Sequence, residues 1–144
     1  MCAKARGIAV NSVTIKDGVL FALLAPAGLA ILDALRRTAQ NLEMDLVITS
    51  GTDGKHSGPD DPHYTGEAYD VRSQGLSSDD KQKVLREVML QLQRGPADAP
   101  IETDQGLFTL HFFGFLESQG TTNEHFHFQR RNRTTFAMAD YLRP

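Results

Sequence analysis

The sequence lacks several features that would have pointed to common protein classes. A single cysteine among 144 residues excludes an intrachain disulfide and a zinc site built on cysteine thiolates. Positive charge is not in excess, since the net charge is -3 and the pI is about 5.9, so we expect no nucleic-acid partner. The most apolar stretch, residues 19–35, is interrupted by Pro26 and Gly28 and is shorter than the roughly 20 apolar residues of a membrane span. We therefore expect neither a membrane span nor a signal peptide.

The chain length fits one domain over residues 1–144, and the element order predicts a mixed α+β fold. Residues 13–21 are expected to form a hairpin that turns at Asp17-Gly18. Other strands are predicted at residues 45–49, 67–71, 107–115 and 125–129. One helix is predicted from Pro26 to about Gln40, and a second begins after Ser77 or Ser78 and ends at Gly95-Pro96. Their buried faces are expected to comprise Leu29, Leu32, Leu35 and Ala39 in the first helix and Val84, Leu85, Val88 and Leu92 in the second.

Histidines are the residues that carry candidate chemistry. His111 lies inside an apolar run and is interpreted as structural, whereas the other four lie in polar stretches. His63 and Asp70 flank a turn at Gly66, whose conformational freedom lets the chain reverse and aim both side chains at one point. Histidine and aspartate are common zinc ligands, but this pair by itself occurs often by chance.

The segment Glu124-His-Phe-His127 adds a third ligand and a candidate general base. Catalytic zinc keeps three protein ligands and an open position, and a nearby carboxylate can accept the proton of the attacking water. In a regular strand His125 and His127 would share one face and Glu124 would lie opposite. Glu124 therefore has to lie in the turn before the strand if it is to converge with His127. His125 remains the competitor of His127 as third ligand, and His56 is interpreted as a solvated loop residue.

These motifs together carry a family resemblance. The pattern His63-x-x-Gly66-x-Ala68-x-Asp70, followed by Glu124-x-x-His127, resembles the M15 family of zinc peptidases, and the strand-to-loop junction that ends at Ser50-Gly51 is similar too. The resemblance covers about residues 45–129. It implies a zinc ion (Zn2+) bound by His63, Asp70 and His127, with Glu124 as catalytic base and then proton donor. It also implies the small antiparallel sheet with packed helices that this family shares with the hedgehog signalling domain.

The chain departs from the family pattern at the residues that hold substrate. Members usually have an aromatic residue and an arginine after the Ser-Gly, where this chain has Thr52-Asp53. Lys55 or Arg72 is the candidate replacement for substrate binding, although a lysine is a point charge and not a bidentate fork. Gln129 stands where an acidic residue usually orients the ligand imidazole, and its amide oxygen can still accept that hydrogen bond.

The resemblance implies zinc-dependent hydrolysis of an amide bond in the peptide stem of bacterial peptidoglycan. A D-alanyl-D-alanine carboxypeptidase-like activity is the first expectation, and an L-alanyl-D-glutamate endopeptidase of the phage endolysin type is the alternative. A non-catalytic zinc-binding module of the same fold, or a phage particle or assembly protein without metal, is also open. We expect a monomer that is made in the cytoplasm and, if it is a phage-type lysis enzyme, released to the cell wall by another factor.

Overall fold

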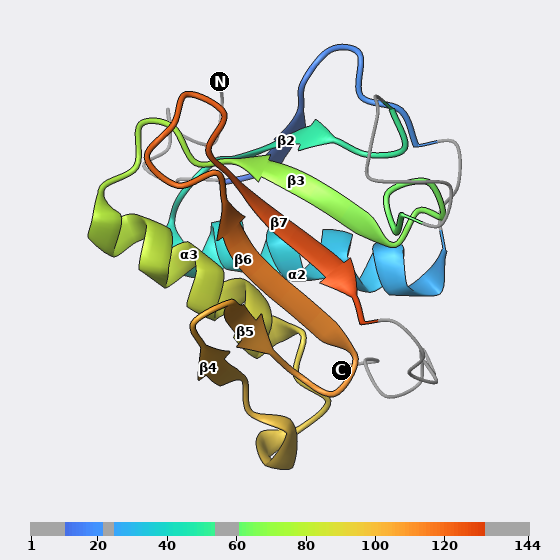
Figure 1. Cartoon of the computed structure of the whole chain (residues 1–144), viewed down its shortest axis with the longest axis vertical. Coiled ribbons are helices and arrows are strands. Elements are labelled where there is room, and N and C mark those ends of the chain that lie inside the picture. The colour runs from blue at the N-terminus through green and yellow to red at the C-terminus, as the bar shows by residue number, and fades with distance from the viewer. Residues whose placement is uncertain (1–10, 22–24, 54–60, 132–144) are drawn as a thin grey trace, which may run out of the picture.

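The computed structural model describes residues 11–21, 25–53 and 61–131, which form one sheet with helices on one of its faces (Figure 1). The strands lie in the order β1-β2-β3-β7-β6-β5-β4, and every neighbouring pair except β1 and β2 is antiparallel. The described part of the chain is therefore an α+β fold with a mostly antiparallel sheet, as predicted. The elements are β1 (Val13–Ile15), α2 (Pro26–Leu42), β2 (Leu46–Ser50), β3 (Ala68–Arg72), α3 (Ser78–Gln91), a 3-10 turn (Pro96–Asp98), β4 (Ile101–Thr103), β5 (Gly106–Phe108), β6 (Phe112–Glu117) and β7 (His125–Arg130).

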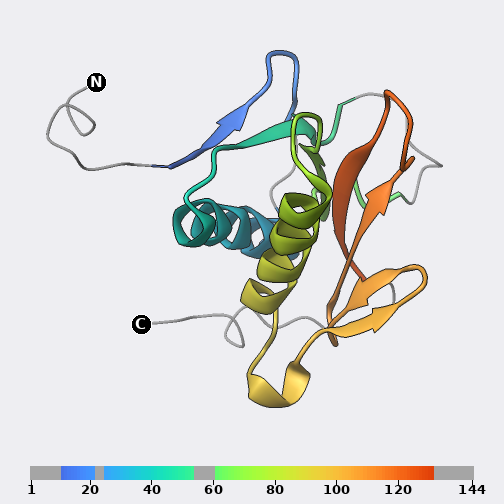
Figure 2. The same cartoon turned by 90° about the vertical axis from the view of Figure 1, so that its left-hand side faces the viewer.

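The core lies between the sheet and the two helices, which pack against the same face (Figure 2). Side chains alternate along a strand, so each central strand has an apolar side and a polar side. In β7 the fully buried Phe126 and Phe128 join the core, and His125 and His127 point to the opposite face. Each buried phenylalanine contributes roughly 1.5–3 kcal/mol through the apolar surface it removes from water. The same alternation in β3 turns Asp70 toward the face of the histidines.

Helix α2 begins at Pro26, as predicted, and ends at Leu42, where the next residue, Glu43, adopts the left-handed conformation with φ of 53°. Its buried face differs from the prediction, because Leu29 is 42% exposed. The helix instead packs through small residues, and a Cβ added at Gly28 would collide with the carbonyl oxygen of Gly66. The buried residues are Ala27, Gly28, Ala30, Ile31, Ala34, Leu35, Thr38 and Ala39.

Helix α3 matches its prediction closely at the N-terminal end. Ser77 caps it, since the Ser77 hydroxyl accepts a hydrogen bond of 3.1 Å from the Asp80 backbone N–H. The predicted stripe of Val84, Leu85, Val88 and Leu92 is buried. The helix ends at Gln91, before the predicted stop at Gly95-Pro96. No helix within the described ranges is long and apolar enough to cross a membrane.

The predicted hairpin over residues 13–21 is absent. Asp17-Gly18 does form a turn, but residues after it do not add a strand, and β1 pairs in parallel with β2. The chain past the turn is instead tied to the loop beyond β2, where the Leu20 carbonyl accepts a hydrogen bond of 2.8 Å from the Thr52 N–H. Hydrogen bonds to β2 take the place of the hairpin, since the Lys16 N–H donates to the Ile48 carbonyl at 3.0 Å and the Ser12 carbonyl accepts from the Leu46 N–H at 3.1 Å. A strand added to a larger sheet is more stable than an isolated two-stranded hairpin.

The predicted strand over residues 107–115 is two strands. Chain reversal occurs at residues 109–111, without glycine or proline, because Thr109 closes the turn itself. Its backbone N–H donates to the Phe112 carbonyl at 2.9 Å, and its hydroxyl accepts from the Phe112 N–H at 3.0 Å. Threonine favours turns more weakly than glycine, proline, asparagine or aspartate. The apolar pattern over residues 107–115 therefore looked like one continuous strand.

Candidate metal centre

His63 is placed by the tight turn that precedes β3. The Glu67 N–H donates to the Pro62 carbonyl at 2.8 Å, and the Gly66 N–H donates to the His63 carbonyl at 3.1 Å. Gly66 has a φ of 73°, the left-handed conformation that the sequence predicted for this position. An Asp61 carboxylate oxygen accepts from the His63 N–H at 2.9 Å. The backbone on both sides of His63 is therefore fixed, and its side chain is directed into the protein.

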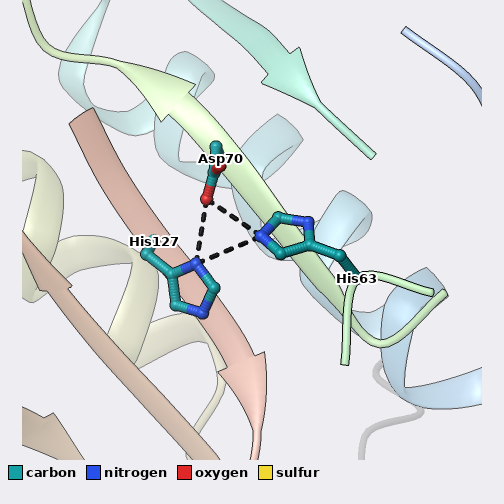
Figure 3. Close-up of side chains that lie close together, drawn as sticks. All are labelled: His63, Asp70 and His127. Atoms are coloured by element: carbon teal, nitrogen blue, oxygen red, sulfur yellow. Dashed lines mark hydrogen bonds and ion pairs between the residues drawn. The ribbon is translucent and has the colours of Figure 1, made fainter. Parts of the chain in front are cut away.

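Three side chains from distant parts of the chain converge on one point (Figure 3). His127 Nδ1 lies 2.9 Å from Asp70 Oδ1, and His63 Nε2 lies 3.2 Å from the same oxygen. The two nitrogens are 3.3 Å apart. Asp70 and His127 face each other across the β3–β7 pair, and all three residues are buried. The structure thus brings together the three predicted ligands as a cluster that can hold a metal ion.

The outer nitrogen of each imidazole in this cluster contacts an oxygen. His63 Nδ1 donates to the Gly51 carbonyl at 2.9 Å, and His127 Nε2 donates to Gln129 Oε1 at 2.8 Å. The Gln129 amide is oriented by its own donation to the Arg130 carbonyl at 3.2 Å. A neutral imidazole has one N–H and one lone pair, so both lone pairs then face the Asp70 carboxylate. Three acceptors at one point require a cation, either a proton or a metal.

The pKa shifts in this cluster favour a proton on His127 when no metal is bound. Burial by itself would raise the pKa of the Asp70 carboxyl, but hydrogen bonds with His127 and His63 outweigh it and hold this pKa well below its usual range. For His127, burial alone would lower the pKa, but the hydrogen bond to Asp70 outweighs burial, so the pKa lies above its ordinary value. Protonated His127 and a metal ion therefore compete for Asp70.

We expect opposite pH dependences with and without metal. The raised pKa of His127 stabilises the metal-free fold below the unfolded-state value of about 6.5, and this contribution is lost as the pH rises through the raised folded value. Zinc affinity should instead increase over the same range, because His127 must lose its proton to bind. Urea unfolding and titration calorimetry between about pH 5.5 and 8.5 measure both slopes. Parallel slopes would contradict the shared position of proton and metal.

Gln129 is predicted to support the metal site from outside. Substitution Gln129→Leu removes the acceptor for His127 Nε2 and should weaken zinc binding about 10–100-fold. The matched variant Gln129→Glu keeps an acceptor at the same place and should bind zinc at least as tightly. Titration calorimetry at one pH compares the two. Equal affinities for both variants would show that the hydrogen bond does not orient the ligand.

Glu124 is not brought to this cluster. Its carboxylate contacts Lys81 in α3 and accepts from the Ser73 hydroxyl at 3.0 Å and the Gly120 N–H at 3.1 Å. The hydrogen bond from Lys81, followed by that from Gly120, lowers the pKa of this carboxyl. Although Glu124 precedes β7, its side chain keeps the strand alternation and lies opposite to His125 and His127. The convergence that the sequence motif required is therefore not present in the structure.

Of the two predicted substrate-binding residues, Lys55 and Arg72, the structure describes only Arg72. Lys55 and His56 lie outside the described residues. Arg72 lies two residues after Asp70 on the same face of β3 and lines a cavity of about 260 Å³. Lys16, which the sequence analysis missed, lines the same cavity, because the parallel pairing of β1 with β2 carries it there. The other lining residues are Thr49, Gln74, Thr122, Asn123, Glu124 and His125.

His125 lies on the same face as His127 and has its own partners. Its Nε2 lies 3.0 Å from Glu117 Oε1 and 3.6 Å from Asp70 Oδ2. Glu117 was not singled out in the sequence, because it lies beyond the strand predicted over residues 107–115 and belongs to neither histidine motif. His111 is buried in the turn before β6 and belongs to neither group of ligating side chains found among the described residues.

Comparisons with protein-family models, with curated proteins and with solved structures found no match to this chain. The resemblance to the M15 family therefore rests on the spacing of His63, Asp70, Glu124 and His127, and membership of that family stays a prediction. The chemistry of the site has to be argued from its own geometry.

Proposed function

We propose that this protein is a zinc-dependent peptidase that cuts an amide bond in the peptide stem of peptidoglycan. The observation that supports it is the convergence of His63 Nε2, Asp70 Oδ1 and His127 Nδ1 at 2.9–3.3 Å from one another. Three protein ligands with an open fourth position are typical of catalytic zinc, whereas structural zinc sites are closed by four.

The ligand set fits zinc better than a hard cation. Two imidazoles and one carboxylate are ligands that zinc and its neighbours prefer, whereas calcium takes six to eight oxygens. Zinc bonds of about 2.0–2.1 Å at tetrahedral angles place neighbouring ligand atoms roughly 3.3 Å apart, close to the separations found here. The hydrogen bonds from both imidazoles to Gly51 and Gln129 would keep the ligating nitrogens in place.

Zinc in this position would polarise the scissile carbonyl and lower the pKa of an attacking water to near 7. Asp70, His63 and His127 would hold the ion, and the fixed orientation of their side chains would limit reorganisation during the reaction. The motif implies Glu124 as general base, but its carboxylate contacts Lys81 and Ser73 and would first have to leave both to act there.

The cavity that Arg72 and Lys16 line favours a substrate with a free carboxylate. Arg72 and Lys16 both line it, and residues two apart on a strand are separated by roughly 7 Å, so Arg72 lies within one substrate residue of Asp70. An arginine fork is suited to bidentate binding of a carboxylate. A stem peptide that ends in D-alanine provides such a group next to its last amide, which favours the carboxypeptidase over the endopeptidase reading.

A non-catalytic metal-binding module of the same fold is the second candidate. It is favoured by one observation, the engagement of Glu124 by three donors away from the cluster. A metal could then organise β3 and β7 around His63 without a base positioned for hydrolysis.

Mass spectrometry of defined muropeptides, incubated with zinc-loaded protein, separates these candidates. We expect the wild type to release the terminal D-alanine from a pentapeptide stem. The variant His63→Ala should lose the zinc ion at this cluster and should no longer cleave the peptide. Arg72→Gln should keep zinc but raise KM for this substrate. Cleavage between L-alanine and D-glutamate would support the endopeptidase instead. Stoichiometric zinc without any turnover would support the non-catalytic module, and absence of bound zinc would contradict both.

A further inference from the structure

The face of the sheet opposite to the two described helices carries a second group of ligating side chains next to the first. Across the central strands, Asp70 lies opposite His127, and Glu117 lies opposite His125. His125 and His127 are two residues apart and share a face, so Asp70 is the diagonal neighbour of His125. One oxygen each from Asp70 and Glu117 and one nitrogen from His125 all lie within 4.8 Å of one another.

The orientation of His125 repeats the arrangement in the first cluster. Its Nδ1 donates to the Asn123 carbonyl at 2.7 Å, which leaves the lone pair of a neutral ring on Nε2. That nitrogen faces Glu117 Oε1 at 3.0 Å and Asp70 Oδ2 at 3.6 Å. With a neutral ring, the lone pair of His125 Nε2 therefore faces two carboxylate oxygens, as the imidazole lone pairs do in the first cluster.

The Asp70 carboxylate connects the two groups. Its Oδ1 contacts His63 and His127, and its Oδ2 lies 3.6 Å from His125 Nε2. A carboxylate whose two oxygens face different ligand sets can bridge two cations, and co-catalytic pairs are typically about 3.5–4 Å apart. We infer that the protein binds a second divalent metal ion through Asp70 Oδ2, Glu117 and His125, beside the first ion.

The chemistry of these ligands indicates the kind of ion and its relative affinity. One imidazole with two carboxylates suits zinc or manganese, and the small number of oxygens disfavours calcium. The Glu117 side chain is 45% exposed, whereas the side chains of the first cluster are buried. The second ion should therefore bind more weakly than the first and exchange more readily, because water competes for its ligands.

The position of this second ion suggests its role. His125 also lines the cavity that contains Lys16 and Arg72, so the ion would lie between the first metal and the proposed substrate carboxylate. It would add positive charge where the substrate is held. This role depends on the proposed function through the shared ligand Asp70, whereas the binding of a second ion can be tested without any activity.

Equilibrium dialysis against Zn2+, followed by elemental analysis, tests the inference. We expect two zinc ions per chain in the wild type, and one in each of the variants His125→Ala and His127→Ala. The conservative variant Glu117→Gln should weaken the second binding event at least about 10-fold and leave the first unchanged. Glu102→Gln is the matched control, since the Glu102 side chain on β4 is also exposed, at 60%, and lies 3.8 Å from Arg86, outside both groups of ligands. It should bind two ions.

The outcomes distinguish this inference from the proposed function. One zinc ion in the wild type, retained in both His125→Ala and Glu117→Gln but lost in His127→Ala, would overturn the second site and leave the proposed peptidase site standing. That pattern would mean that a proton on His125 pairs with Glu117 instead. No bound zinc in the wild type would overturn both. Two ions in Glu117→Gln with unchanged affinities would also overturn the ligand set inferred here.

Discussion

Asp70→Asn is expected to abolish zinc binding at the His63–His127 cluster and with it any hydrolysis of muropeptides. Asparagine keeps the shape of the side chain but removes the negative charge, and Asp70 is the one carboxylate in that cluster. Loss of an outer hydrogen-bond partner weakens a metal site about 10–100-fold, so loss of this direct ligand should cost more than about 100-fold. Titration calorimetry with Zn2+ and the muropeptide assay measure both effects.

The same substitution should also remove the second zinc ion, since Asp70 is the bridging ligand. Asp104→Asn is a suitable control, because Asp104 is an exposed residue of the turn between β4 and β5 and lies outside both groups of ligands. It should bind zinc and cut muropeptides like the wild type. Full activity of the Asp70→Asn protein after treatment with a chelator would show that the reaction does not use this metal centre.

Glu124→Gln is expected to retain zinc and most of the hydrolytic activity while lowering the thermal midpoint by several degrees. The Glu124 carboxylate joins the start of β7 to Ser73 after β3 and to Lys81 in α3. Removing its charge leaves the Lys81 ammonium without its anionic partner. Lys81→Met removes the donor instead and should have a similar effect on stability, and the double variant should show coupling between the two.

The alternative result would restore the role that the motif implies for Glu124. A general base contributes typically 10²–10⁴-fold to the rate. If kcat falls by that amount in Glu124→Gln, with zinc and the thermal midpoint unchanged, Glu124 leaves Lys81 during the reaction and acts at the metal. Lys81→Met would then have little effect on stability. Scanning calorimetry and steady-state kinetics on the same preparations decide between the two roles.

Local features of the fold could be predicted because their signals are short. Pro26 at the start of α2, the Ser77 cap of α3 and the turn at Gly66 each depend on the backbone preferences of one or two residues. The pairing of β1 with β2 could not be predicted in the same way. Asp17-Gly18 favoured a hairpin locally, but the partner of β1 is a strand about thirty residues further along the chain, and that pairing depends on the tertiary context.

For the site too, features set by local geometry could be predicted and those set by long-range packing could not. His63 and Asp70 are separated by one turn, so their convergence followed from local geometry, and strand periodicity placed His125 and His127 on one face. That periodicity also placed Glu124 opposite, and the structure agrees with the periodicity. The motif had suggested a convergence that the backbone before β7 does not provide. Lys55 lies outside the described residues, and its role stays a prediction.

The sequence by itself determined a set of candidate metal ligands, His63, Asp70 and His127. These could be found because the residue types and their spacing within two short segments can be read directly from the sequence. Only the tertiary structure decided which other groups surround them. Strand order placed Glu117 beside His125 and carried Lys16 to the cavity of Arg72. Lys16 and Arg72 lie far apart in the chain, and the pairing of Glu117 with His125 depends on the register between β6 and β7. These positions depend on sheet pairing and core packing, which no local pattern specifies.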